Sequence, residues 1–173
     1  MLKAFCGQSG RLPPAIRFRA ANNADIPFLC TLYASTRADE LSQLDWSEEQ
    51  KTTFLKMQFD AQHHHYHEQF PATDFLVIEQ DGAQIGRVYI DRREDELRLI
   101  DIALMPETRN QGLGGALLLD LLDEAQNTGL PVRIHVETFN PAMRLYLRLG
   151  FKPVEDRGVY QLMEWLPAGS LSS

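Results

Sequence analysis

The residues best suited to chemistry lie in a glycine-rich turn between an apolar strand and an apolar helix. The turn covers residues 109–115 (RNQGLGG) and follows the apolar stretch Leu99–Leu104, which Met105 and Pro106 bring to an end. In this arrangement several backbone N–H groups are free, and the partial positive charge of the helix N-terminus favours an anion. Glycine lets the backbone curl round an anion without a Cβ in the way. The turn therefore predicts a pocket for a phosphate-bearing ligand.

The spacing within the turn narrows the choice of ligand. A Walker-type loop would need a lysine before Ser or Thr, and the turn contains no lysine. The dinucleotide fingerprint would need a third glycine where Leu117 stands. The pattern that fits is Arg109-x-x-Gly112-x-Gly114, which resembles the pyrophosphate loop of the GNAT superfamily of acyl-CoA-dependent N-acetyltransferases. A plain strand-to-helix turn is the alternative.

A second segment is similar to the same superfamily. The segment from Asn140 to Phe151 resembles its pattern Asn-x-x-Ala-x-x-Leu-Tyr-x-x-x-Gly-Phe with one residue fewer after the asparagine, and Tyr146 stands in the tyrosine position. Many members separate the asparagine and the tyrosine by seven residues, whereas six separate them here. Because Pro141 suits the first turn of a helix, capping is a rival role for Asn140.

The resemblance implies acetyl-CoA as the donor and gives each motif a role. The N–H groups of residues 111–115 would hold the pyrophosphate, and the edge of Ile102–Leu104 would pair with the pantetheine arm. Tyr146 would bind the cofactor and protonate the leaving thiolate, the alternative being an aromatic residue of the core. The full set of expected cofactor-binding residues is Ile102, Ala103, Leu104, Arg109, Asn110, Gln111, Gly112, Leu113, Gly114, Gly115, Asn140 and Tyr146.

Asp101 is the first of three candidates for the general base. It lies inside an apolar strand, where a carboxylate is costly unless it has a partner or a purpose. Burial would raise its pKa toward the range that a base needs. The alternative is a structural ion pair with Arg98 or Arg133, which would hold the pKa down.

His135 and Glu137 are the other two candidates. The alternation of the next strand places them on the face opposite Val132 and Val136. Counted back from Asn140, His135 also aligns with an acidic residue that serves as the base in some GNAT enzymes. A structural histidine is the alternative, since histidines on strands are more often structural.

The segment 63–67 (HHHYH) is the remaining cluster of reactive side chains. His63 and His67 are four residues apart and share a helix face, but neither a His-Glu-x-x-His pattern nor a third ligand accompanies them. We therefore expect no metal. In GNAT proteins this helix overhangs the acceptor cleft, so Tyr66 and Tyr89 are candidates to contact the acceptor.

Composition limits the class of protein. A chain of 173 residues with a net charge of −7 suits one domain, argues against a nucleic-acid partner and is compatible with a cationic amine. No apolar run approaches the roughly 20 residues of a membrane helix, and residues 1–14 lack a signal-peptide core. Cys6 and Cys30 show no metal spacing and are expected to be free thiols. These observations predict a cytoplasmic protein that does not bind membranes.

The order of elements predicts an α/β (α+β) domain of the GNAT type. It would have a mixed, mostly antiparallel sheet of about seven strands flanked by about four helices. We expect an N-terminal arm over 1–14, the acetyltransferase domain over 15–166 and a tail over 167–173. The elements are a strand at 16–19, a helix from Asn22 to about Arg37, a helix from Ser47 to about Phe70, a hairpin at 75–91, a strand at 96–104, a helix at 114–128, a strand at 132–136, a helix from Pro141 to Gly150, and strands from Phe151 and at 159–165.

Together these features predict an N-acetyltransferase that moves acetyl from acetyl-CoA to a primary amine of a small molecule, peptide or protein. Neither motif contains a cysteine, so direct attack in a ternary complex is expected rather than a covalent acyl-enzyme. The alternative is a catalytically silent domain that binds or senses acyl-CoA. The resemblance leaves a homodimer open, and the sequence does not name the acceptor.

Overall fold

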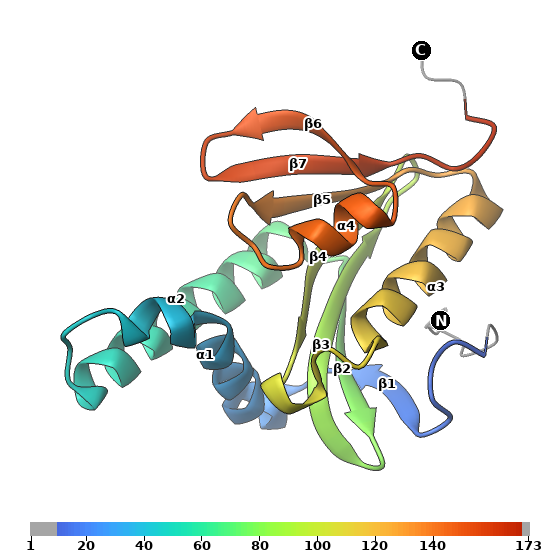
Figure 1. The fold of residues 1–173 in the computed structure, drawn as a ribbon. Helices are drawn as coiled ribbons and strands as arrows, with labels where there is room; N and C mark the ends of the chain where they lie inside the picture. The colour runs from blue at the N-terminus through green and yellow to red at the C-terminus, as the bar shows by residue number, and fades with distance from the viewer. Residues whose placement is uncertain (1–9, 171–173) are drawn as a thin grey trace.

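The computed structural model describes residues 10–170, which form a seven-stranded sheet flanked by four α-helices (Figure 1). The sheet order is β1-β2-β3-β4-β5-β7-β6, and every neighbouring pair is antiparallel except β4 and β5. This confirms the predicted fold class. The elements are β1 (Ile16–Ala20), α1 (Ile26–Ser42), α2 (Glu48–Gln69), β2 (Asp74–Gln80), β3 (Ala83–Arg92), β4 (Leu97–Leu104), α3 (Leu113–Thr128), β5 (Val132–Glu137), α4 (Met143–Arg148), β6 (Lys152–Arg157) and β7 (Tyr160–Trp165), with short 3₁₀ turns at Asn23–Asp25 and Pro106–Thr108.

Capping residues start the first two helices as their spacing predicts. Asn22 and Asp25 form a reciprocal capping box ahead of α1, and Ser47 and Gln50 form one at the start of α2. The predicted end of α1 near Arg37 is wrong, because the helix continues to Ser42. Its last turn is held by Leu41, which is buried although the residues before it are polar.

The helices cover the two faces of the sheet in separate pairs. Helices α3 and α4 pack on one face, where the α3 residues Leu117, Leu118 and Leu121 enter the larger core. Helices α1 and α2 lie on the other face and share a smaller core with Phe59 at its centre (Figure 1). This division leaves the C-terminal ends of β4 and β5 between the two helix pairs.

A β-bulge in β4 separates the two central strands. Leu99 pairs with Ile90 and Asp101 with Tyr89, so Ile100 is the extra residue. The parallel pairing of β4 with β5 stops at Leu99, directly before the bulge, although both strands continue. A bulge bends its strand and increases the local twist. The C-terminal half of β4 therefore diverges from β5 and leaves one backbone edge unpaired over 100–104.

The N-terminal end of the described chain packs against the domain. Leu12 is 8% exposed and belongs to the larger core, and Arg11 forms ion pairs with Asp120 and Asp123 on α3. The N-terminal arm expected over 1–14 is therefore packed from Arg11 onward. Residues 1–9, including Cys6, and 171–173 lie outside the described residues. Cys30 is a free thiol.

Within residues 10–170 no helix combines the length and the apolar character needed to cross a membrane.

Candidate functional site

The glycine turn is shaped to receive an anion at the start of α3. Asn110 and Gly112 both have positive φ, 61° and 81°, so the chain curls twice before the helix begins at Leu113. N–H groups of a first helical turn have no acceptor within the helix. A Cβ at Gly112 would meet no atom within 4 Å, and one at Gly114 would lie 3.9 Å from Leu104 Cδ1. The donors therefore face open space beside the end of β4.

Arg109 uses its side chain to position this turn. Its Nε donates to the carbonyl oxygen of Leu104 at 2.8 Å, and its Nη2 donates to Ser35 Oγ at 3.1 Å. These two bonds join the end of β4 to α1. The side chain of the motif arginine thus fixes the strand edge and the turn relative to each other, and its backbone N–H donates to the carbonyl oxygen of Pro106.

Helix α1 spans the ends of both diverging strands. Ser35 is tied to the β4 end through Arg109, and Arg37, two residues further along α1, donates from Nη2 to Glu137 Oε1 at 3.1 Å. Glu137 is the last residue of β5. The space between the unpaired half of β4 and β5 is therefore bounded by α1.

Tyr146 is buried near this divergence. It is 2% exposed, and its ring packs edge-on against Phe151 with the ring centroids 5.6 Å apart. Burial raises its pKa above the ordinary value of 10.0, and the negative charge of Asp101 adds to the effect. The phenol therefore keeps its proton at neutral pH, which suits a proton donor.

Asp101 is held by a buried arginine that the sequence did not suggest. Its Oδ2 accepts from Arg87 Nε at 2.6 Å, and Arg87 Nη2 donates to Gln62 Oε1 of α2 at 2.9 Å. The expected partners, Arg98 and Arg133, are wrong. Arg87 lies on β3 beside Asp101 because the bulge places Asp101 opposite Tyr89, two residues away from it.

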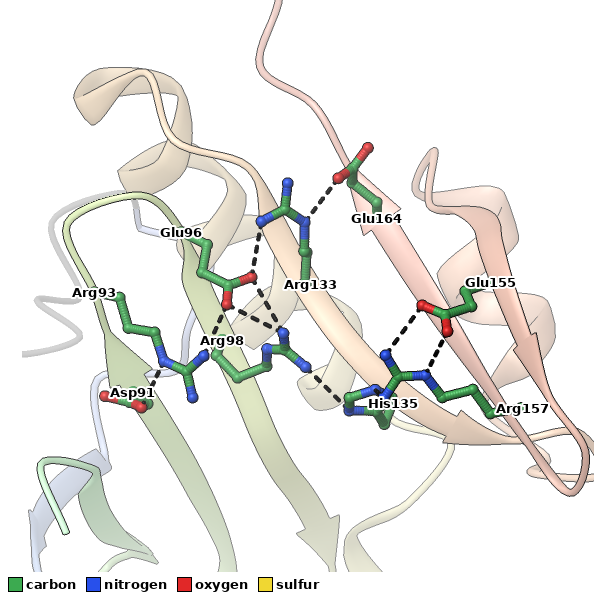
Figure 2. Close-up of polar contacts among 9 residues, drawn as sticks. All are labelled: Asp91, Arg93, Glu96, Arg98, Arg133, His135, Glu155, Arg157 and Glu164. Atoms are coloured by element: carbon green, nitrogen blue, oxygen red, sulfur yellow. Dashed lines mark hydrogen bonds and ion pairs between the residues drawn. The ribbon is translucent and has the colours of Figure 1, made fainter. Parts of the chain in front are cut away.

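Arg98 and Arg133 converge instead on a different carboxylate. Both guanidinium groups contact Glu96, which is 4% exposed, and Arg93 adds a third contact (Figure 2). Hydrogen bonds from Arg133 and Arg98 lower the pKa of Glu96 against the opposing effect of its burial. This cluster is a structural ion network at the N-terminal ends of β4 and β5.

His135 belongs to the same charged face of the sheet. Its Nδ1 lies 3.0 Å from Arg98 Nη1 and its Nε2 lies 3.2 Å from Arg157 Nη1 (Figure 2). Burial lowers the pKa of His135, and the two guanidinium charges lower it further. A neutral imidazole has one acceptor nitrogen for two such donors. Both ring nitrogens of His135 are therefore engaged by arginine side chains.

Glu137 faces an open pocket of about 380 Å³ at the end of β5. Helices α1 and α2, the end of β5 and the β6–β7 turn enclose this pocket. The side chain of Glu137 is 37% exposed and shares Arg37 with Glu40. The lining residues are Tyr33, Arg37, Glu40, Leu41, Phe54, Gln58, Glu137, Phe139, Val159 and Tyr160.

Tyr66 and Tyr160 connect the pocket with Asp101. Burial raises the pKa of Tyr66, and the charges of Asp101 and Tyr160 contribute in the same direction. Of these residues, Tyr160 lines the pocket. Tyr89, the other tyrosine considered for acceptor contact, is 1% exposed and packs edge-on against Tyr66 in the interior.

The histidine segment of α2 packs against aromatic rings. His67 stacks on Phe75 with the ring centroids 4.0 Å apart, and His63 stacks on Phe59 at 5.5 Å. Burial lowers the pKa of both histidines. Among residues 10–170 no three His, Cys, Asp or Glu side chains converge closely enough to hold a metal ion.

Asn140 organises the turn that leads into α4. Its Oδ1 accepts from Ala142 N at 2.8 Å, and the helix begins at Met143 rather than at Pro141. The side chain of Asn140 is thus engaged in a local turn ahead of α4, while Ala142 occupies the N-cap position of the helix without a side-chain cap bond.

A helix start suited to an anion, an open strand edge and an adjoining pocket are the features expected of an acyltransferase of the acyl-CoA-dependent class. A family model described as the acetyltransferase (GNAT) family matches residues 38–151. The chain belongs to this family. It is an N-acetyltransferase with acetyl-CoA as the acyl donor, and the alternative of a silent acyl-CoA sensor is not favoured.

A relative with a named activity agrees with this assignment. The chain is 32% identical over 113 residues to a putative [ribosomal protein bS18]-alanine N-acetyltransferase of Bacillus subtilis (strain 168), covering 58% of this chain and 74% of that protein.

Two solved structures share the fold. The PaiA N-acetyltransferase of Thermoplasma acidophilum in complex with coenzyme A is 20% identical, with a TM-score of 0.66 over 87% of this chain and 98% of that one. The ribosomal-protein-S18-alanine N-acetyltransferase of Escherichia coli is 21% identical, with a TM-score of 0.56 over 91% and 96% of the two chains.

Proposed function

We propose that the acetyl group is transferred between the diverging ends of β4 and β5, to a primary amine that enters from the pocket beside Glu137. The observation that carries this proposal is the convergence of three features. The α3 N-terminus opens beside the end of β4, Tyr146 lies within electrostatic range of Asp101, and the pocket reaches the end of β5.

The chain's backbone would hold the donor in this scheme. N–H groups of residues 111–115 fit a pyrophosphate, because Gly112 leaves open space and an anion is favoured at a helix start. The unpaired edge of Ile102–Leu104 can bond to an amide-rich arm as a neighbouring strand would. When bound there, acetyl-CoA supplies the activated acetyl group.

Tyr146 would act as the proton donor. Its hydroxyl stays protonated because burial raises its pKa, so it can supply a proton to the departing thiolate. The negative charge of Asp101 also raises the pKa of Tyr146, and Arg87 holds Asp101 in place through an ion pair. Asp101 is therefore a positioning residue in this scheme.

Glu137 is the residue we favour for binding and deprotonating the attacking ammonium. Of the three candidate bases, it is the one that lines the pocket. Asp101 is locked to Arg87, and both ring nitrogens of His135 contact arginines. Arg37 bonds to one oxygen of Glu137 and leaves the other available.

For the acceptor we propose a class of compound, the primary amines. The Bacillus relative is named for acting on an alanine of a ribosomal protein, and an open pocket also suits the amine at the end of a peptide. The cytoplasmic location and the homodimer stay predictions.

Thiol release from acetyl-CoA in the presence of amines tests the proposal. Glu137→Gln should lower kcat/KM by about a hundredfold or more, the usual contribution of a general base, while CoA affinity is unchanged. Glu155→Gln is the matched control, because Glu155 is an exposed carboxylate paired with Arg157 outside the pocket. A rate for Glu137→Gln equal to that of the control would refute the role of Glu137.

A further inference from the structure

The pocket beside Glu137 carries a particular balance of charge. The guanidinium of Arg37 contacts Glu40 Oε1 at 3.2 Å and Glu137 Oε1 at 3.1 Å. One positive charge is thus shared between two carboxylates, and these three groups are the charged residues in the lining. The pocket therefore has an excess of one negative charge, which suits one ammonium group.

The rest of the lining is mostly apolar. Tyr33 and Leu41 are buried in its wall, and Phe54 is supported edge-on by Trp46 with the ring centroids 5.3 Å apart. Such a lining favours the burial of a hydrocarbon or aromatic group and gives no second partner to a second ammonium.

The outer wall of the pocket exposes large apolar side chains to solvent. Phe139 is 93% exposed, Val159 is 68% exposed and Tyr160 is 43% exposed. They come from two neighbouring segments, the end of β5 and the β6–β7 turn, and all three line the pocket. Exposed apolar side chains that gather at a concave site are typical of a binding surface.

We propose that the preferred acceptor is a singly charged primary amine with a bulky apolar or aromatic group close to the nitrogen. This inference rests on the proposed function, because it takes the pocket as the acceptor site. The ammonium binds at Glu137, and the apolar group packs between Phe54 and the outer wall formed by Phe139, Val159 and Tyr160. The same chemistry is found in free arylalkylamines and at a peptide N-terminus with a large apolar first residue.

Matched acceptors separate charge from size. Pentylamine and 1,4-diaminobutane have the same number of heavy atoms, but the second carries an ammonium where the first carries a methyl group. At saturating acetyl-CoA, we expect kcat/KM for pentylamine to be at least about tenfold higher, and that for 2-phenylethylamine higher still.

A peptide amide beginning Phe-Gly-Gly is compared with one beginning Ala-Gly-Gly. A preference for the Phe peptide over 2-phenylethylamine identifies a peptide source, and the reverse identifies a free amine.

A variant of the outer wall tests the assignment to these residues. Phe139→Ala removes a side chain that is almost fully exposed, so the fold should be retained. We expect a rise of about tenfold in KM for 2-phenylethylamine with kcat little changed, and a much smaller effect on ethylamine. Leu166→Ala is the control, because Leu166 is an exposed apolar residue outside the pocket and should change neither value.

The outcomes distinguish this inference from the proposed function. Turnover that is fastest with 1,4-diaminobutane, or that is equally affected by Phe139→Ala for every amine, overturns the inference and leaves the acetyltransferase site intact. An absence of thiol release with all amines refutes the proposed function. Calorimetric binding of the same amines to the protein with CoA still decides the preference of the pocket in that case.

Discussion

Replacing Tyr146 with phenylalanine should separate catalysis from folding. The change removes one hydroxyl and keeps the ring, which is 2% exposed and packs edge-on against Phe151. Among residues 10–170, no group forms a hydrogen bond with this hydroxyl. Because the ring and its packing are kept, the free energy of unfolding should change by no more than about 1 kcal/mol.

The rate of acetyl transfer should fall. A general acid contributes about 10²–10⁴ to the rate, and each factor of ten corresponds to about 1.4 kcal/mol of barrier. Tyr146→Phe should therefore raise the barrier by about 3–6 kcal/mol through kcat. Affinity for CoA should change little, because the backbone of residues 111–115 would hold the pyrophosphate.

The assay is thiol release at saturating acetyl-CoA and amine, with the unfolding midpoint in denaturant measured on the same samples. Phe151→Leu is a control that alters the packing around the ring and leaves the hydroxyl in place, so it should lower stability more than turnover. Turnover of Tyr146→Phe within threefold of the unchanged protein would refute proton donation by Tyr146.

Three further predictions concern the glycines and the histidines. Gly114→Asp should abolish CoA binding, measured by calorimetry, without unfolding the domain, because its Cβ has ordinary space but its carboxylate enters the anion site. Gly86→Ala should lower the free energy of unfolding by about 1–3 kcal/mol in denaturant titrations, because its Cβ would lie 2.5 Å from Ala103 O. Acidification below about pH 6.5 should lower the unfolding midpoint, because burial lowers the pKa of His63 and His67 in the folded state from an ordinary 6.5. The unfolded state then binds more protons, so the stability present above pH 6.5 decreases toward the lower folded pKa values.

Controls for these three experiments come from the same elements. Leu119→Asp adds the same charge to the exposed side of α3 and should leave CoA affinity unchanged. In the histidine experiment, the double variant His63→Gln/His67→Gln should reduce the slope of stability against pH, whereas exposed His64→Gln should not. Retained CoA affinity in Gly114→Asp, a neutral Gly86→Ala or an unchanged slope would contradict the respective reasoning.

Local signals in the sequence were sufficient to predict most of the helices and strands and the glycine turn that leads into α3. Reciprocal side-chain caps at Asn22 and Ser47 and the αL residue at Gly129 act within a few positions of the chain, so their spacing alone reports them. The predicted order of strands and helices along the chain then matched that of the superfamily. The comparisons confirm that the chain belongs to this family.

The partners of the candidate residues could not be predicted, because they depend on register between distant strands. Arg87 reaches Asp101 only after the bulge at Ile100 has shifted the register of β4 against β3. Arg37 reaches Glu137 across 100 residues of chain. Periodicity within one strand shows the face of a side chain but does not show its neighbour on another element.

The lining of the pocket beside Glu137, our proposed acceptor site, was not predicted for a related reason. Phe139, Val159 and Tyr160 follow or begin strands, where apolar residues are ordinarily taken as core. The available signal was an aromatic residue, Phe139, placed directly before Asn140 and Pro141 in a turn, a position that a buried side chain seldom occupies.

Ile100 shows how much of this enzyme depends on a single backbone position. Before it, Leu97 and Leu99 point into the larger core; after it, Ile102 and Leu104 do so, and Asp101 points toward α2. If β4 instead kept its regular alternation through Ile100, the side chain of Asp101 would point into the larger core and those of Ile102 and Leu104 away from it. The bulge at this one residue thus keeps Asp101 out of the larger core and lies where β4 and β5 cease to pair.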